Sequence, residues 1–108
     1  MPNSGTRGDA CEALDANLAE SIVLEAYVQL PLLPPQADGS RVAPLKSFAH
    51  CDLRLVEQIG GASDQPVLRV ELFDRRARSA VKVQGCEEVE DAVSAFLAMI
   101  PLAKSYET

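Results

Sequence analysis

The chain has 108 residues, of which 47% are hydrophobic and 24% are charged, and its formal net charge is −6. This length fits a single domain with one core. The acidic balance argues against general nucleic-acid binding and against attraction to an anionic membrane, because both surfaces recruit basic proteins.

The first residues predict a polar, flexible leader over residues 1–8, followed by one domain over residues 9–108. No apolar segment typical of a signal peptide occurs there, which favours a cytoplasmic protein. Cysteine usage agrees with this prediction, since Cys11, Cys51 and Cys86 are odd in number and far apart in the chain.

The early part of the domain is ambiguous between helix and strand. Asp9 with Glu12 matches a capping box, which predicts a short helix over about Ala10–Glu20. From Ser21 to Leu30 the apolar residues nearly alternate, which favours a strand, although a helical stripe is also present. We interpret Ser21–Leu30 as a strand and keep a continued helix as the alternative.

Three prolines, Pro31, Pro34 and Pro35, end that element because proline supplies no amide donor. The stretch Leu32–Lys46 predicts a long loop, and its leucines suggest an arm over Leu30–Pro35 that docks on a partner. The alternative is a loop folded over the edge of its own sheet.

The second half predicts a sheet. Two segments alternate apolar and polar residues, Cys51–Ile59 and Val67–Phe73, and Val81 with Val83 marks a further short strand. Short polar turns separate these strands, which indicates an antiparallel meander with one wet face. Arg69 and Glu71 are expected on that face.

An amphipathic helix is predicted over about Cys86–Ile100 and is expected to end at Pro101. Its acidic first turns suit the positive end of a helix dipole. One apolar stripe is formed by residues at helical spacing: Val89, Ala92, Val93, Phe96 and Ile100. The fold class is therefore α+β, a meander of three to four strands packed against this helix, with a short N-terminal helix.

One such helix covers only part of a sheet of this size. A short N-terminal helix or a second copy must cover the rest, and we therefore expect a homodimer.

Charge is sorted along the chain, which points to a binding turn. Five acids and one base lie between Met1 and Leu30, whereas five bases and three acids lie between Gly61 and Gly85. Arg75, Arg76 and Arg78 follow Asp74 on one turn, where arginine forks suit a carboxylate or a phosphate. They are the candidate residues for an acidic protein partner or an anionic ligand. The alternatives are a solvated hairpin tip or ion pairs with the acidic helix of a second copy.

Other chemistry is weakly supported. His50 and Cys51 are neighbours, but on a strand their side chains point to opposite faces and cannot form a dyad. A zinc site from Cys11, His50, Cys51 and Cys86 lacks any paired ligand spacing. We therefore predict no metal, no cofactor and no catalytic residue.

If residues 10–30 formed one helix, the element order would resemble that of double-stranded-RNA-binding domains. Those domains have basic residues where the last helix begins, whereas this helix begins with the acidic segment Cys86–Asp91. The likeness would then be one of topology and would not imply their activity. The size and acidity are also similar to those of dimeric chaperones of bacterial secretion systems, with no shared motif.

Two hypotheses of function follow. The first is a non-enzymatic protein-interaction or accessory protein that acts through the arm or the arginine turn. The second is a small-molecule-binding protein or small enzyme with a pocket between sheet and helix, using His50, Cys51 or Arg75.

Overall fold

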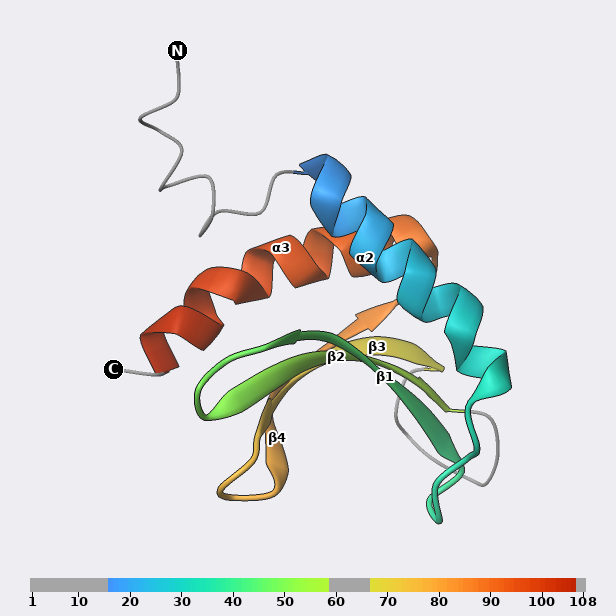
Figure 1. Ribbon diagram of the computed structural model, residues 1–108, viewed down its shortest axis with the longest axis horizontal. Helices are drawn as coiled ribbons and strands as arrows, with labels where there is room; N and C mark the ends of the chain where they lie inside the picture. The colour runs from blue at the N-terminus through green and yellow to red at the C-terminus, as the bar shows by residue number, and fades with distance from the viewer. Residues whose placement is uncertain (1–15, 59–66, 107–108) are drawn as a thin grey trace.

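The computed structural model describes residues 16–58 and 67–106, which form a four-stranded antiparallel sheet with two helices on one face (Figure 1). The elements in chain order are α2 (Ala16–Gln29), the short 3-10 helix η1 (Leu30–Leu32), β1 (Ser40–Ser47), β2 (Cys51–Gln58), β3 (Leu68–Asp74), β4 (Ser79–Cys86) and α3 (Val89–Tyr106). The predicted α+β class and meander are confirmed. The leader and the capping box of Asp9 and Glu12 lie outside the described residues.

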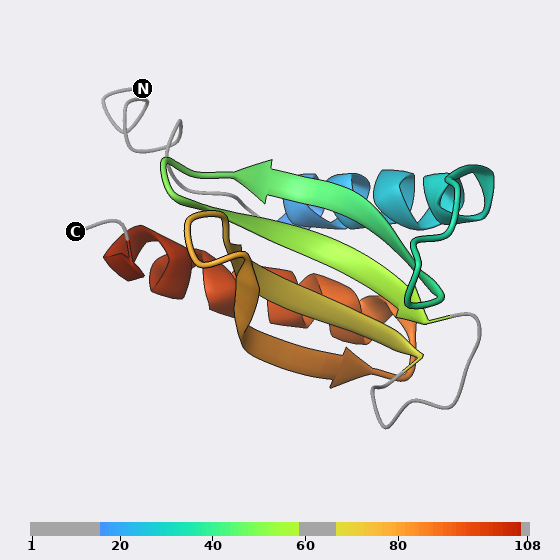
Figure 2. The same cartoon turned by 90° about the horizontal axis from the view of Figure 1, so that it is seen from below.

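The strands lie in the order β1-β2-β3-β4, so each pairs with its neighbour in sequence. In this meander β1 and β4 form the two edges of the sheet. Figure 2 shows the sheet in front and both helices behind it, with α2 nearer β1 and β4 at the opposite edge.

The core lies between the sheet and the two helices. Alternating side chains of the central strands point into it, among them Leu53, Leu55 and Val70, all fully buried. The stripe of α3 predicted from its spacing meets them, with Phe96 fully buried at its centre. Burial of such apolar area is the main stabilising contribution, at about 25 cal/mol per Å².

The strand predicted at Ser21–Leu30 is wrong, because this segment belongs to α2 as far as Gln29 and then to η1. Ala19, Val23 and Ala26 are buried at helical spacing, and α2 packs against both α3 and β1. The alternation that suggested a strand arises because the outer side of α2 is also apolar. Tertiary packing decided between two patterns that the sequence contains.

The long loop predicted over Leu32–Lys46 is wrong from Ser40 onward, where β1 begins. Pro44 has no amide donor, and it is tolerated because β1 is an edge strand with a neighbouring strand on one side only. The register against β2 shifts between Pro44 and Lys46, which marks a bulge. The proline and the bulge interrupt the alternation of apolar and polar residues in β1, so the sequence pattern did not indicate a strand there.

The last helix begins later and ends later than predicted. Cys86 closes β4, and α3 runs from Val89 through Pro101 to Tyr106. Pro101 removes one backbone hydrogen bond, but Ala103 is fully buried beyond it. Packing of that last turn on the core keeps the helix intact past the proline. None of the helices within residues 16–58 and 67–106 is long and apolar enough to cross a membrane.

Candidate functional site

The arginine turn joins β3 to β4 and is built by Asp74. One carboxylate oxygen of Asp74 accepts the amides of Arg76 at 2.8 Å and of Ala77 at 3.2 Å, and its carbonyl accepts the amide of Arg78 at 2.7 Å. Arg78 adopts a left-handed backbone conformation with φ of 57°. An Asp at the start of a turn supplies these acceptors routinely, so the sequence favoured this turn for a local reason.

The three candidate arginines separate into two kinds. The guanidinium of Arg75 donates to the carbonyls of Phe48 at 2.6 Å and of Cys51 at 3.0 Å, and also to the carbonyl of Ala49. It forms an ion pair with Asp52 as well. Arg75 therefore joins the β3–β4 turn to the β1–β2 turn.

Arg76 and Arg78 are exposed, and neither forms an ion pair among the residues that the structure describes. The turn therefore offers two cations rather than three to a partner.

His50 and Cys51 do not form a reactive pair. Cys51 is fully buried and its sulfur lies 3.9 Å from the carbonyl oxygen of Ala103, whereas the carbonyl of His50 accepts the amide of Arg75. Cys51 lies opposite Asp74 on β3 and Cys86 lies opposite Leu68, so about 20 Å of strand separates the two thiols.

Cys86 sits at the end of β4 beside the start of α3. Burial raises the pKa of its thiol, and the nearby carboxylate of Asp91 raises it further. A thiol held protonated is a poor nucleophile. Cys11 lies outside the described residues, and no three His, Cys, Asp or Glu side chains gather into a metal-binding group in the described part.

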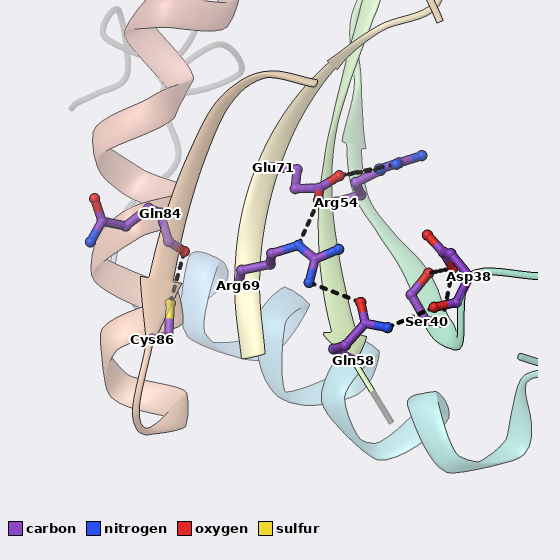
Figure 3. Close-up of polar contacts among 8 residues, drawn as sticks. All are labelled: Asp38, Ser40, Arg54, Gln58, Arg69, Glu71, Gln84 and Cys86. Atoms are coloured by element: carbon purple, nitrogen blue, oxygen red, sulfur yellow. Dashed lines mark hydrogen bonds and ion pairs between the residues drawn. The ribbon is translucent and has the colours of Figure 1, made fainter. Parts of the chain in front are cut away.

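A network of buried charges lies on the face of the sheet that the helices leave open (Figure 3). Glu71 accepts from Arg54 at 3.0 Å and from Arg69 at 2.7 Å. Arg69 also reaches Gln58, and the guanidinium of Arg54 stacks over the ring of Phe73 at 3.9 Å. Arg69 and Glu71 are each only 5% exposed.

Arg69 and Glu71 were expected on the wet face, and they do lie on the side without helices. Both residues are nevertheless buried. The register places Glu71 opposite Arg54, and knowledge of that pairing would have indicated this network. The sequence alone does not give the register, because residues 59–66 separate the two strands.

The acids at the start of α3 serve the helix. A carboxylate oxygen of Asp91 accepts the amides of Glu87 and Glu88, each at 3.1 Å. These bonds satisfy amide donors that a helix start leaves without partners. The side chains of Glu87, Glu88 and Glu90 remain exposed, which leaves an acidic surface directly after β4.

An open groove of 670 Å³ lies between β4 and α3. Its lining mixes polar and apolar groups: Lys82, Gln84, Gly85, Glu87, Asp91, Ser94, Ala95, Ala98, Met99 and Leu102. The second hypothesis placed a pocket between sheet and helix that used His50, Cys51 or Arg75, and none of these residues lines this groove.

An exposed apolar surface covers the outer side of α2 and continues onto η1. We call it the α2 outer face, and its residues are Leu24, Tyr27, Val28 and Leu32. Val28 is 67% exposed and Leu32 is 80% exposed. Apolar side chains therefore occupy both sides of α2, whereas a surface helix of a monomer usually has one polar side.

Comparisons with family models, with curated proteins and with solved structures found no match for this chain. The geometry alone therefore carries the interpretation of the site. Its described surface features are the α2 outer face, the β4 edge with its charged ends and the mixed groove.

Proposed function

We propose that this protein is a small non-enzymatic protein-interaction protein that binds a partner protein on the α2 outer face. The exposure of Leu24 and Val28 one turn apart on α2, together with that of Leu32 on η1, is the observation that carries this proposal. Contiguous exposed apolar side chains are typical of docking sites, whereas single ones are common on any surface.

The charges around the α2 outer face favour a partner different from a second copy. Glu20 and Glu25 are the only charged residues of α2, and residues 26–37 carry no charge at all. Pairing α2 with itself would bring four carboxylates together without a base from this segment. A partner segment with an apolar row flanked by Lys or Arg complements the same surface.

A comparison of two valines tests this proposal. Val28 and Val67 are both 67% exposed, but Val67 immediately precedes β3 and belongs to neither α2 nor η1. We expect tagged wild-type protein and Val67→Asp to retain the same partner from a cell extract, and Val28→Asp to lose it. Reconstitution with the purified partner should reproduce the difference. Equal retention by all three proteins, or retention of nothing by any of them, would contradict the proposal.

The groove between β4 and α3 supports a second candidate function, the binding of a small molecule. Its lining joins Lys82 and Ser94 to the apolar Met99 and Leu102, a mixture that suits a ligand with a polar end and an apolar end. Ser94→Leu would fill the groove. A ligand seen by native mass spectrometry on the wild type, and absent from Ser94→Leu, would favour this candidate.

A further inference from the structure

The two edges of the sheet differ in how they are protected. β1 contains Pro44 and a bulge, and both α2 and η1 pack against it. β4 contains no proline, and its residues from Ser79 to Gln84 are all exposed. Proteins commonly protect exposed edge strands with such devices. β4 has a bulge at Val81 and the charged Lys82, and α3 packs against it. It has no proline, however, and its run Lys82–Cys86 is regular and stays free of bulges, so this part of the edge is less protected than β1.

An open edge strand offers hydrogen-bonding groups to another strand. Alternate residues of β4 direct their amides and carbonyls away from β3. The register against β3 leaves Val81 as an extra residue near the turn, and the run Lys82–Cys86 is regular. Val81 and Val83 also expose apolar side chains along this edge.

The charges at the two ends of β4 are of opposite sign. Arg76 and Arg78 precede the strand and are exposed, and Glu87, Glu88 and Glu90 follow it and are also exposed. We propose that β4 pairs antiparallel with β4 of a second copy about a two-fold axis. In that arrangement the arginine turn of each copy lies beside the acidic start of α3 in the other copy.

An axis near Val83 gives a consistent set of contacts. In this two-fold pairing the helices of both copies lie on one side of the joined sheet. Residues directly opposite each other in the antiparallel pair then point to the same face of that sheet. Val83 then meets Val83 of the second copy, and Lys82 meets Gln84 of the second copy. Arg78 lies close to the position of Glu88, so opposite charges meet at both ends of the pairing.

A second copy is favoured over a peptide from another protein because the charge order is self-complementary. A strand that pairs antiparallel with β4 must carry acids after it to meet Arg76 and Arg78, and bases before it to meet Glu87 and Glu88. β4 itself has this arrangement. In an isologous two-fold interface each contact occurs twice, so both charged ends of β4 contribute to the stability of the dimer.

This interface leaves the α2 outer face accessible. α2 lies nearer β1, and β4 is the opposite edge of the sheet (Figure 2). The dimer is independent of the proposed function, and it would present two copies of the docking face.

Two charge-reversed variants test the interface. Arg76→Glu with Arg78→Glu makes both ends of β4 acidic, and Glu87→Arg with Glu88→Arg makes both ends basic. We expect each variant alone to raise the dimer Kd at least about tenfold, because like charges then meet at both ends. An equimolar mixture of the two variants should form a mixed dimer, which native mass spectrometry identifies by its mass.

The control is Lys46→Glu, a charge reversal on the β1 edge, which should leave the wild-type dimer unchanged. Circular dichroism of every variant confirms that it is folded. The proposal is overturned if the wild type is monomeric at tens of micromolar, if neither variant weakens the dimer, or if the mixture forms no mixed dimer. Capture of a different protein on the β4 edge by a monomeric wild type would also overturn it.

Discussion

The arginines of the central strands and those of the β3–β4 turn show how the same residue type acquires different roles. Arg54 on β2 and Arg69 on β3 share Glu71, which lies opposite Arg54 in the register and two residues after Arg69 on the same strand. Arg76 and Arg78 lie on a turn where the carboxylate of Asp74 accepts backbone amides and that of Asp52 pairs with Arg75. Arg54 and Arg69 therefore have carboxylate partners within the sheet, whereas Arg76 and Arg78 form no ion pair among the described residues.

Arg75 lies at the boundary between the two groups. It is on the same turn as Arg76, but the carbonyls of the β1–β2 turn lie within its reach. It therefore acts as a structural residue at a position that the sequence assigns to binding. Substitutions of single residues can measure this difference.

Replacing Glu71 should have the largest effect on stability. Glu71→Ala leaves both Arg54 and Arg69 without their shared carboxylate on a face where Arg69 is 5% exposed. Removal of one partner from a buried ion pair costs about 3–5 kcal/mol of unfolding free energy. Urea denaturation measures the loss. Glu90→Ala, which removes an exposed acid of α3, is the control and should stay within about 0.5 kcal/mol.

Replacing Arg75 should have a smaller effect. Its hydrogen bonds join two turns, but its side chain is 40% exposed, so water replaces part of what is lost. We expect Arg75→Ala to lower the unfolding free energy by about 1–2 kcal/mol. Arg76→Ala on the same turn should change it by less than about 0.5 kcal/mol. Equal effects of the two substitutions would contradict a structural role for Arg75 that Arg76 lacks.

Replacing Arg78 by glycine should stabilise the monomer slightly. Arg78 has a φ of 57°, a conformation that glycine adopts without the steric cost that a Cβ atom imposes. We expect Arg78→Gly to raise the unfolding free energy by about 0.5–1 kcal/mol in dilute protein. The same change removes a charge from the proposed dimer contact, so it should weaken the dimer while it stabilises the monomer. A loss of monomer stability would show that the arginine side chain has a local partner.

The sequence predicted correctly the elements whose apolar residues follow a single periodicity, either helical or alternating. It gave the wrong element where both periodicities are present. The stripe through Phe96 and the alternation around Leu53 each allow one burial pattern, and both are confirmed. Residues 21–30 carry a helical and a strand pattern together, because α2 is apolar on its outer side as well. The same property that caused the wrong assignment creates the α2 outer face.

The candidate site was predicted in part for a similar reason. Asp74 and the arginines after it are contiguous, so the turn is readable from local sequence. The bonds of Arg75 to the β1–β2 turn and the pairing of Arg54 with Glu71 join residues more than fifteen positions apart. Such contacts depend on strand register, which composition and periodicity do not supply.

Hydrogen exchange at β4 as a function of protein concentration tests the central claim most directly. If β4 is the edge at which two copies meet, the amides in Lys82–Cys86 that point away from β3 should exchange slowly at high concentration and rapidly at high dilution, while those of β1 stay unchanged. Exchange at β4 that is fast and independent of concentration would contradict the account.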